Sequence, residues 1–317
     1  MSKFYASPIT ALLLILLPFM VSQAPIHDYA AKKHLPKLSV SDSGSFSAIT
    51  YNIAGLPEFI SSAVTKRAVS IADIGGRLNS YDIAHVQEDF NYHKSLYQGH
   101  NQHSYRTETK GVVPFGDGLN TLSKYPIHRL SRIRWNDCTG ADCLTPKGFS
   151  YTQIQVALGV FIDFYNVHAN AYNHPAAARA RCNNVLQLSK YIASHSKGNA
   201  VIVMGDLNGH YSFSKDNIHT LLKNNGLSDA WVLLQNQNEM PGHGEMLPAS
   251  NILDLPPSSE TIDKILYRSS SELVLAPENY KLESEGFRNQ KGISLSDHHP
   301  VSVSFQWKKR QGSIARM

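Results

Sequence analysis

The chain contains a series of polar residues that can bind a divalent cation or transfer a proton, and each of them ends or follows a run of apolar residues. They are Asn52, Glu88, the pair Asn166 and His168, the pair Asp206 and Asn208, and the pair Asp297 and His298. Carboxylates and carboxamides supply hard oxygen ligands, and imidazole titrates near neutral pH. Strands that stop at such residues can bring them together at one sheet edge, where a cation and a proton acceptor would lie side by side.

Each motif also has a simpler structural explanation when it is taken alone. Gly205–Gly209 is typical of a turn, and Glu88 suits a solvated strand end. His168 suits a buried, hydrogen-bonded histidine, and Asp263 suits the first residue of a strand. The run Asp297–Pro300 is harder to explain in this way, because two histidines beside an acid precede a proline. The functional prediction therefore depends on the joint pattern.

The elements that would position these residues are short apolar strands with helices between them. The predicted strands are Phe46–Ile53, Tyr81–Gln87, Leu119–Ser123, Phe149–Val156, Val160–Val167, Ala200–Met204, Lys264–Arg268 and Val301–Trp307. The predicted helices are Ser61–Asn79, Pro175–Ser194 and Asp216–Asn225. Residues 232–260 and 276–295 have weak periodicity and are predicted to be long loops. Strands with interspersed helices favour an α/β sandwich.

Composition and the ends of the chain set its organisation. The 317 residues are 42% apolar and 17% charged, which excludes a disordered chain and a small disulfide-stapled scaffold. Ile9–Val21 is apolar but shorter than the roughly 20 residues of a spanning helix, and it follows Lys3. We therefore expect a signal peptide over 1–24, a leader over 25–45, one domain over 46–307 and a basic tail over 308–317, with no transmembrane segment.

Three cysteines are present, and two interpretations of them remain open. In an oxidising compartment Cys138 and Cys143 could form a disulfide across a short loop and leave Cys182 free. Otherwise all three would be reduced and packed. The net charge of +5 tolerates an anionic partner such as nucleic acid or a lipid headgroup, but it does not choose between them.

Six of the motifs occur together in an order that resembles the endonuclease/exonuclease/phosphatase superfamily, whose fold is that of pancreatic deoxyribonuclease. They are Thr50–Ile53, His85–Glu88, Asn166–His168, Gly205–Asn208, Ile262–Asp263 and Ser296–Pro300. The resemblance covers roughly Phe46 to Trp307, nearly all of the predicted domain. It implies an α/β, four-layered sandwich of two packed, mostly antiparallel β-sheets flanked by helices. It also implies metal-dependent hydrolysis of phosphoesters.

The same resemblance implies a role for each residue. Glu88 would be the main ligand of Mg²⁺ (or of Mn²⁺ or another divalent cation), with Asn52 and Asp297 beside it. Such a cation and an imidazole can offset the negative charge that a phosphodiester develops in its transition state.

For catalysis, the resemblance implies His298 as the general base, oriented by Asp263. Asp206 and Asn208 would position water and a phosphate oxygen, and His168 would stabilise the phosphoryl oxygens or assist the leaving group.

Local features are similar to those of the secreted neutral sphingomyelinases. Cys138–Phe149 and the run from His168 to Asn184 fit this branch, whereas the residues expected of inositol polyphosphate 5-phosphatases are missing around Asp263. The branch implies Asp117 as a partner of His168, with Asn166 supporting the site. One departure is that Ala276–Gly292 is short and polar, where bacterial relatives have an aromatic hairpin that enters the membrane.

We therefore expect a secreted, monomeric phosphodiesterase that hydrolyses a sphingomyelin-like phospholipid, in the manner of phospholipase C, at a membrane surface. One alternative is a secreted nuclease similar to deoxyribonuclease I, although no clear basic and aromatic run is present. The other is an inactive member that only binds lipid or protein.

Overall fold

A computed structural model describes residues 27–28, 38–98, 100–109, 116–244 and 252–310 of the protein. In the first of its two sheets the strand order is β1-β6-β7-β8-β9-β11-β10. These strands are β1 (His27–Asp28), β6 (Ile127–Arg134), β7 (Gly148–Ala157), β8 (Val160–His168), β9 (Val201–Asp206), β10 (Ser228–Asp229) and β11 (Asp263–Arg268).

In the second sheet the strand order is β12-β13-β2-β3-β5-β4. Its strands are β2 (Ser43–Asn52), β3 (Ile83–Gln87), β4 (Tyr105–Arg106), β5 (Asn120–Ser123), β12 (Leu273–Leu282) and β13 (Val301–Lys309). Only the β2–β3 and β8–β9 pairs are parallel among the strands of the described residues.

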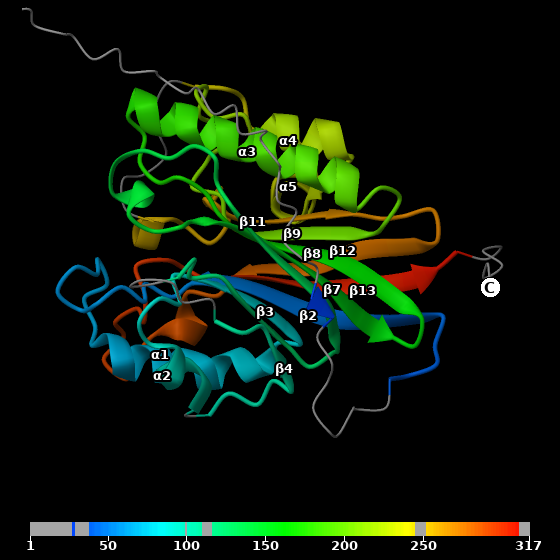
Figure 1. The fold of residues 1–317 in the computed structure, drawn as a ribbon, viewed down its shortest axis with the longest axis horizontal. Helices are drawn as coiled ribbons and strands as arrows, with labels where there is room; N and C mark the ends of the chain where they lie inside the picture. Colours follow the sequence, from blue (N-terminus) through cyan, green and yellow to red (C-terminus); the bar gives the residue numbers. More distant parts are fainter. Residues whose placement is uncertain (1–26, 29–37, 99, 110–115, 245–251, 311–317) are drawn as a thin grey trace, which may run out of the picture.

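The helices form the two outer layers (Figure 1). They are α1 (Arg67–Arg77), α2 (His93–Gln98), α3 (Pro175–His195), α4 (Ile218–Asn225) and α5 (Ala230–Gln235), with short 3₁₀ turns η1 (Leu78–Ser80), η2 (Gly140–Cys143), η3 (Ile252–Asp254) and η4 (Glu285–Phe287). α3, α4 and α5 lie above the first sheet, and α1 and α2 lie below the second. This arrangement confirms the predicted four-layered α/β sandwich.

Alternation along β2 explains how one strand packs against two layers. Phe46 and Ala48 belong to the core between the sheets, whereas Ile49 and Tyr51 belong to the core between the second sheet and α1. Side chains two apart on a strand share a face, so successive residues serve opposite cores. The sheets are joined by aromatic packing, since the ring of Phe46 lies 6.2 Å from that of Phe164 on β8.

All eight predicted strands are present with small shifts at their ends, and the helices over α3 and α4 are confirmed. The helix predicted from Ser61 instead begins at Arg67, because the buried Arg67 side chain donates hydrogen bonds to the carbonyls of Ile53 and Ala54. These bonds hold the preceding residues in a turn-rich loop.

The structure contains strands and helices in places that the sequence did not predict. β12 occupies part of the segment predicted as a loop over 276–295, and α5 extends from Ala230 into the other predicted loop, 232–260. β12 is an edge strand that contains Pro277 and a register shift after Glu278, so its alternation is broken. β6 was missed because it is rich in arginine and also contains a register shift.

The folded strands extend slightly beyond the predicted domain 46–307. β2 begins at Ser43, and Ser43 pairs with Lys308 of β13 in the predicted tail. The predicted signal peptide, 1–24, lies outside the described residues. Among the residues that are described, no helix combines the length and the apolar character needed to cross a bilayer.

Candidate active site

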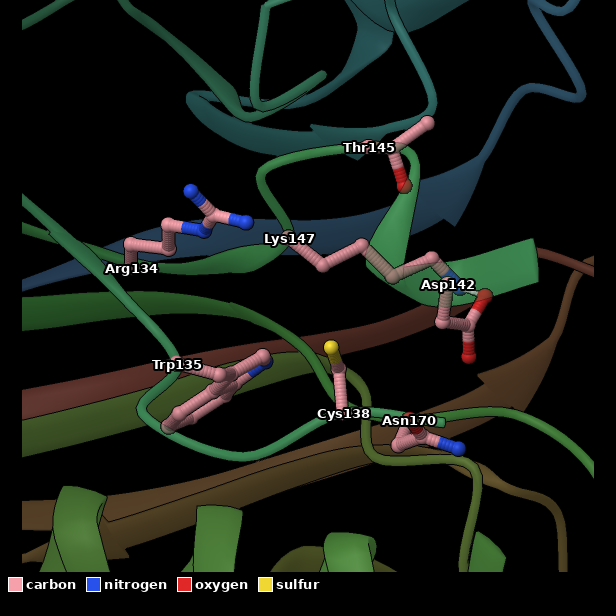
Figure 2. A pocket seen from close by; sticks show the side chains of 7 residues that line it. All are labelled: Arg134, Trp135, Cys138, Asp142, Thr145, Lys147 and Asn170. Carbon is pink, nitrogen blue, oxygen red and sulfur yellow. Dashed lines mark ion pairs between the residues drawn. The ribbon is translucent and has the colours of Figure 1, made fainter. Parts of the chain in front are cut away.

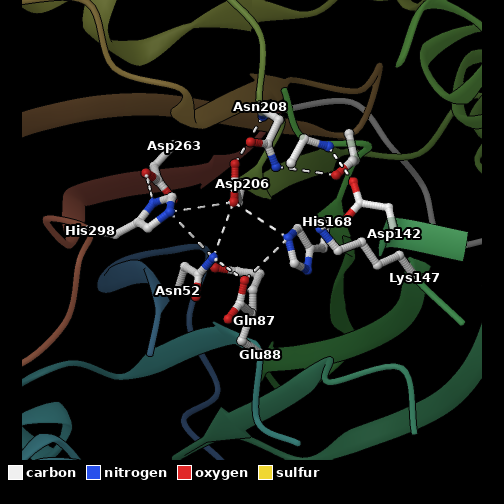
Figure 3. A network of polar contacts seen from close by, with 12 residues as sticks. Asn52, Gln87, Glu88, Asp142, Lys147, His168, Asp206, Asn208, Asp263 and His298 are labelled. Atoms are coloured by element: carbon white, nitrogen blue, oxygen red, sulfur yellow. Dashed lines mark hydrogen bonds and ion pairs between the residues drawn. The ribbon is translucent and has the colours of Figure 1, made fainter. Parts of the chain in front are cut away.

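Strands of both sheets place polar side chains at one end of the sandwich (Figure 3). The register of the first sheet aligns three of them, because His168 on β8 pairs with Asp206 on β9, and Asp206 pairs with Asp263 on β11. The second sheet contributes Asn52 at the end of β2 and Glu88 directly after β3. Convergence of distant motifs therefore results from strand register across two packed sheets.

Asn52 lies at the centre of the site and contacts residues from three other segments. Its Nδ2 donates hydrogen bonds to Glu88 Oε1 at 3.2 Å and to Asp206 Oδ2 at 3.1 Å, and it lies 3.4 Å from His298 Nε2. Its Oδ1 accepts a hydrogen bond from the Ala54 backbone, which orients the amide. Asn52 thus holds two carboxylates and an imidazole around one point.

His298 and Asp263 form a close pair at the site. His298 Nδ1 lies 2.8 Å from Asp263 Oδ2, and Nε2 lies 3.8 Å from Asp206 Oδ2. Burial disfavours a charge on the ring, but Asp263 and Asp206 together raise the pKa of His298 well above its usual value. This geometry directs Nε2 toward the centre of the site.

His168 faces the opposite side of Asp206. Its Nε2 lies 3.6 Å from Asp206 Oδ2 and 3.8 Å from Glu88 Oε1. Burial, reinforced by the charges of Lys147 and His298, lowers the pKa of His168 well below its usual value. The ring is therefore neutral near pH 7 in this environment.

The predicted pairing of Asp117 with His168 is wrong. Asp117 Oδ1 instead forms an ion pair with Arg132 at 2.6 Å, and it also accepts a hydrogen bond from the Leu119 backbone. His168 Nδ1 is buried and has no hydrogen-bond partner among the described residues. The missed strand β6 carries Arg132, so the sequence analysis could not anticipate this competitor.

The positive charges near the site do not neutralise its carboxylates. Burial raises the pKa of Glu88 and raises the pKa of Asp206 to about 7, despite the nearby Lys147 and His298. Asp263 Oδ1 is buried and finds no hydrogen-bond partner in the part of the chain that the structure describes. Asp206, Asp263 and His298 each offer a ligand atom within 4.8 Å of the others. This donor set fits a divalent cation, which prefers carboxylate oxygens.

None of the three residues predicted as metal ligands (Glu88, Asn52 and Asp297) belongs to this group of Asp206, Asp263 and His298. Glu88 and Asn52 contact one another at the site centre, and their role as metal ligands stays a prediction. Asp297 is half-buried, and the structure gives its carboxylate a hydrogen bond from Ser296.

Two residues of the site have left-handed backbone conformations. Glu88 has φ of 58° and Asn208 has φ of 51°. Asparagine tolerates this region well, whereas a glutamate there costs roughly 1–2 kcal/mol. Asn208 also receives support from the site, because its N–H donates to Asp206 Oδ1 and its Nδ2 donates to the Ala169 carbonyl. Glu88 is the residue at which the chain turns out of β3.

Asn166 lies behind the site and joins the two sheets. Its Nδ2 donates to the carbonyls of Val86 and Asn120, and its Oδ1 accepts a hydrogen bond from Gln87 Nε2 at 2.7 Å. It therefore holds β8 against β3 and β5 and supports the positions of Glu88 and His168.

Lys147 is a residue of the site that the sequence analysis did not single out. Its ammonium group lies 2.7 Å from Asp142, and its side chain extends toward His168 in Figure 3. Asp142 is held in η2 beside a Cys138–Cys143 disulfide, which confirms that possibility, while Cys182 is free. The signal in the sequence was that Lys147 lies in Cys138–Phe149, a run that resembles the secreted neutral sphingomyelinases.

A small polar pocket lies next to this ion pair (Figure 2). It is lined by Arg134, Trp135, Cys138, Asp142, Thr145, Lys147 and Asn170. Trp135 Nε1 donates a hydrogen bond to the His168 carbonyl at 2.7 Å, and Asn170 Oδ1 accepts one from Thr139. The disulfide loop is thus fastened to the end of β8.

Two packed sheets with carboxylates and histidines at one end define a protein with the deoxyribonuclease I architecture. The family model described as Endonuclease/Exonuclease/phosphatase family 2 matches residues 58–245. This match covers more than half of the chain, and the chain belongs to this family.

Curated relatives and solved structures are similar to the chain. It is 40% identical over 271 residues to proteins named sphingomyelinase from Mycobacterium tuberculosis and Mycobacterium bovis, covering 84% of this chain and 53% of each relative. The chain therefore spans about half the length of the curated relatives it matches.

Among solved structures, sphingomyelinase C from Streptomyces griseocarneus is 19% identical, with a TM-score of 0.56 over 82% of this chain and 99% of that one. A β toxin variant from Staphylococcus aureus with bound magnesium ions is 16% identical, with a TM-score of 0.55 over 82% and 99%. These likenesses show the fold.

Proposed function

We propose that the protein is a Mg²⁺-dependent phosphodiesterase that hydrolyses sphingomyelin-like phosphodiesters in the manner of phospholipase C. The observation that supports it most directly is the continuous set of contacts from Asp263 through His298 and Asn52 to Glu88. The 40% identity to mycobacterial sphingomyelinases supports the choice of substrate. The reaction would add water across the P–O bond on the lipid side and release a phosphorylated headgroup and a lipid alcohol.

In this proposal His298 removes a proton from the attacking water. The Asp263 carboxylate accepts the Nδ1–H of His298, which leaves Nε2 free to receive that proton. Asp263 and Asp206, which raise the pKa of His298, would stabilise the resulting imidazolium. Because the raised pKa favours the imidazolium, only the fraction of the protein with a neutral His298 would be active, and that fraction grows as the pH rises. Asp263 would thus orient the base and compensate its charge.

The cation would be held by Glu88 with Asn52 and Asp297, and Asp206 lies within reach of the same point. A bound divalent ion would neutralise these acids and offset charge on the phosphoryl oxygens. The magnesium-containing β toxin structure supports Mg²⁺ as the first ion to test, with Mn²⁺ as a second.

The remaining residues would position the reactants. Asp206 and Asn208 would orient the water and one phosphate oxygen. His168 would act as a neutral hydrogen-bond donor toward the phosphoryl group or the leaving oxygen, because its pKa is lowered by burial. Lys147, two residues before Phe149 on β7, would add positive charge on that side.

We also propose that the protein acts outside the cytoplasm. The Cys138–Cys143 disulfide supports this destination, because disulfides persist mainly in oxidising compartments. The apolar N-terminal segment that suggested export lies outside the described residues.

The test is a substrate panel with the purified chain. Sphingomyelin vesicles, plasmid DNA and an inositol phosphate are each incubated with Mg²⁺, with Mn²⁺ and with a chelator. We expect Mg²⁺-dependent release of phosphocholine from sphingomyelin, which the chelator abolishes. Folded His298→Ala protein is the control for contaminating activity.

Each other outcome has a defined meaning. Turnover of DNA alone would replace the lipid substrate with nucleic acid. No turnover of any substrate, with metal bound and the fold intact, would mean that the chain is a binding protein.

A further inference from the structure

The loop between β2 and α1 exposes large apolar side chains beside the site. Phe59 is 88% exposed, Val64 is 84% exposed and Ile60 is 50% exposed. Val69, on the first turn of α1, is exposed as well. Single exposed apolar residues are ordinary, but several within one short segment indicate a surface that contacts something other than water.

This loop is held in place rather than loosely attached. The Pro57 carbonyl accepts hydrogen bonds from the backbone N–H groups of Ile60 and Ser61. Ser61 Oγ donates to the Ala54 carbonyl, and the Glu58 N–H donates to Tyr92 Oη. The backbone therefore keeps the apolar side chains turned outward.

The loop adjoins the catalytic residues directly. It follows Asn52 in the chain, and the Asn91 N–H donates a hydrogen bond to the Gly55 carbonyl in the segment that follows Glu88. In Figure 1 the loop after β2 lies at the same end of the molecule as η2, whereas the turn between β7 and β8 lies at the opposite end.

Other loops at this end add to the same surface. Leu144, Tyr172 and Ile293 are exposed, and they lie within four residues of Lys147, His168 and Asp297 respectively. Exposed apolar side chains are thus found on several of the loops that surround the site.

The charge of the loop indicates the kind of partner. Between Gly55 and Lys66 the charged residues are Glu58 and Lys66, so the segment is neutral overall. Nucleic acid binding requires an excess of positive charge, which this segment lacks. A zwitterionic lipid surface instead favours apolar side chains with little net charge.

We propose that the loop of residues 55–66 inserts Phe59 and Val64 into a zwitterionic lipid bilayer and holds the site against the membrane surface. This inference rests on the proposed function and adds to it the element that docks the enzyme. It also provides a membrane contact in a chain whose segment 276–292 has no aromatic hairpin, since β12 and η4 occupy that region.

The experiment compares two double variants. Phe59→Ser with Val64→Ser removes the proposed contact, and Val40→Ser with Leu158→Ser removes exposed apolar groups elsewhere. Leu158 lies in the β7–β8 turn, and the nine residues of β8 place that turn about 30 Å from the site.

Binding is measured by sedimentation with vesicles of sphingomyelin and phosphatidylcholine, and activity is measured on those vesicles and on a water-soluble short-chain sphingomyelin.

We expect the first variant to lose at least ~10-fold in vesicle binding and vesicle hydrolysis, because two apolar groups no longer leave water. The first variant should hydrolyse the soluble substrate at an unchanged rate. The control variant should be unchanged in vesicle binding and in both activities. In addition, Phe59→Trp should give a blue-shifted emission when vesicles are added.

Several results would overturn the inference. These are unchanged vesicle binding in the first variant, equal losses in both variants, or a proportional loss on the soluble substrate. A change of oligomeric state would assign the loop to contact between copies of the chain. If the chain binds vesicles through Phe59 and Val64 but hydrolyses nothing, the proposed function fails while the docking surface stands.

Discussion

At the scale of single residues, the chemistry of the site depends on pairs rather than on isolated groups. In the proposed mechanism His298 is a useful base only if Asp263 holds its Nδ1, and the 2.8 Å contact between them allows the two residues to act as one unit. Asn52 is equally dependent on its neighbours, since its amide is fixed by the Ala54 backbone and the two carboxylates. Substitutions within such a unit should not have additive effects.

We predict that His298→Ala lowers kcat/KM by about 10²–10⁴-fold, the usual contribution of a general base. Asp263→Asn keeps the shape of the side chain but removes the charge that orients the ring, so it should lose a similar factor. The double variant should be little worse than His298→Ala alone. The measurement is a double-mutant cycle on a soluble phosphodiester, with circular dichroism as the folding control.

Losses that multiply in the double variant would show that the two residues act independently. Near-normal activity of His298→Ala would remove His298 from the role of general base.

At the scale of elements, the ends of β2 and β3 and the loop before β13 are tied together. Arg67 Nη1 donates a hydrogen bond to the Leu295 carbonyl, while its Nε and Nη2 hold the carbonyls of Ala54 and Ile53. One buried side chain thus connects the segment of Asn52 to the segment of His298. Arg181 connects segments beside the first sheet in the same way. It forms an ion pair with Asp216 and donates hydrogen bonds to the carbonyls of Asn170 and Tyr172.

Close backbone packing at Gly55 gives an element-scale prediction. A Cβ at Gly55 would lie 2.1 Å from the Glu88 carbonyl oxygen, so the segments that follow β2 and β3 would have to move apart. Gly55→Ala should destabilise the fold by about 1–3 kcal/mol through overpacking and raise the Mg²⁺ concentration needed for activity. Urea unfolding and a Mg²⁺ titration of activity measure both effects.

The matched control is Gly242→Ala, because a Cβ there would meet no atom of the described segments within 4 Å. Equal behaviour of the two variants would contradict a packing requirement at Gly55.

At the scale of the whole molecule, stability should depend on pH through buried neutral histidines. His103 is one of them, with Nε2 3.0 Å from the Tyr81 carbonyl and Nδ1 3.0 Å from Asn101 Nδ2. Burial lowers the pKa of His103 to about 4, whereas an unfolded histidine titrates near 6.5. The unfolded chain therefore binds the proton first as the pH falls, and stability is lost between about pH 6.5 and pH 4.

His103→Gln should reduce the loss of unfolding free energy between about pH 6.5 and pH 4 by up to about 3 kcal/mol. The check is the free energy of unfolding in urea at several pH values, with exposed His100→Gln as the control. If the unfolding free energy of His103→Gln changes with pH as steeply as that of the unmodified protein, His103 contributes nothing to the pH dependence.

Local patterns in the sequence were sufficient for much of the fold. Short apolar runs predicted eight strands, and polar residues after such strands predicted a site at one sheet edge. Patterns of this kind repeat within a few residues, so they can be recognised without the rest of the chain. β12 was missed because an edge position tolerates a proline and a bulge that erase its period.

The tertiary structure alone decided which side chains meet. The sequence analysis expected Asp117 to pair with His168, but the fold brings Arg132 closer, and it places Lys147 against Asp142 beside the site. The exposure of Phe59 and Val64 is likewise a property of a loop held by Tyr92 and Pro57. These outcomes depend on strand register and loop course over long sequence separations, which residue types and local spacing do not encode.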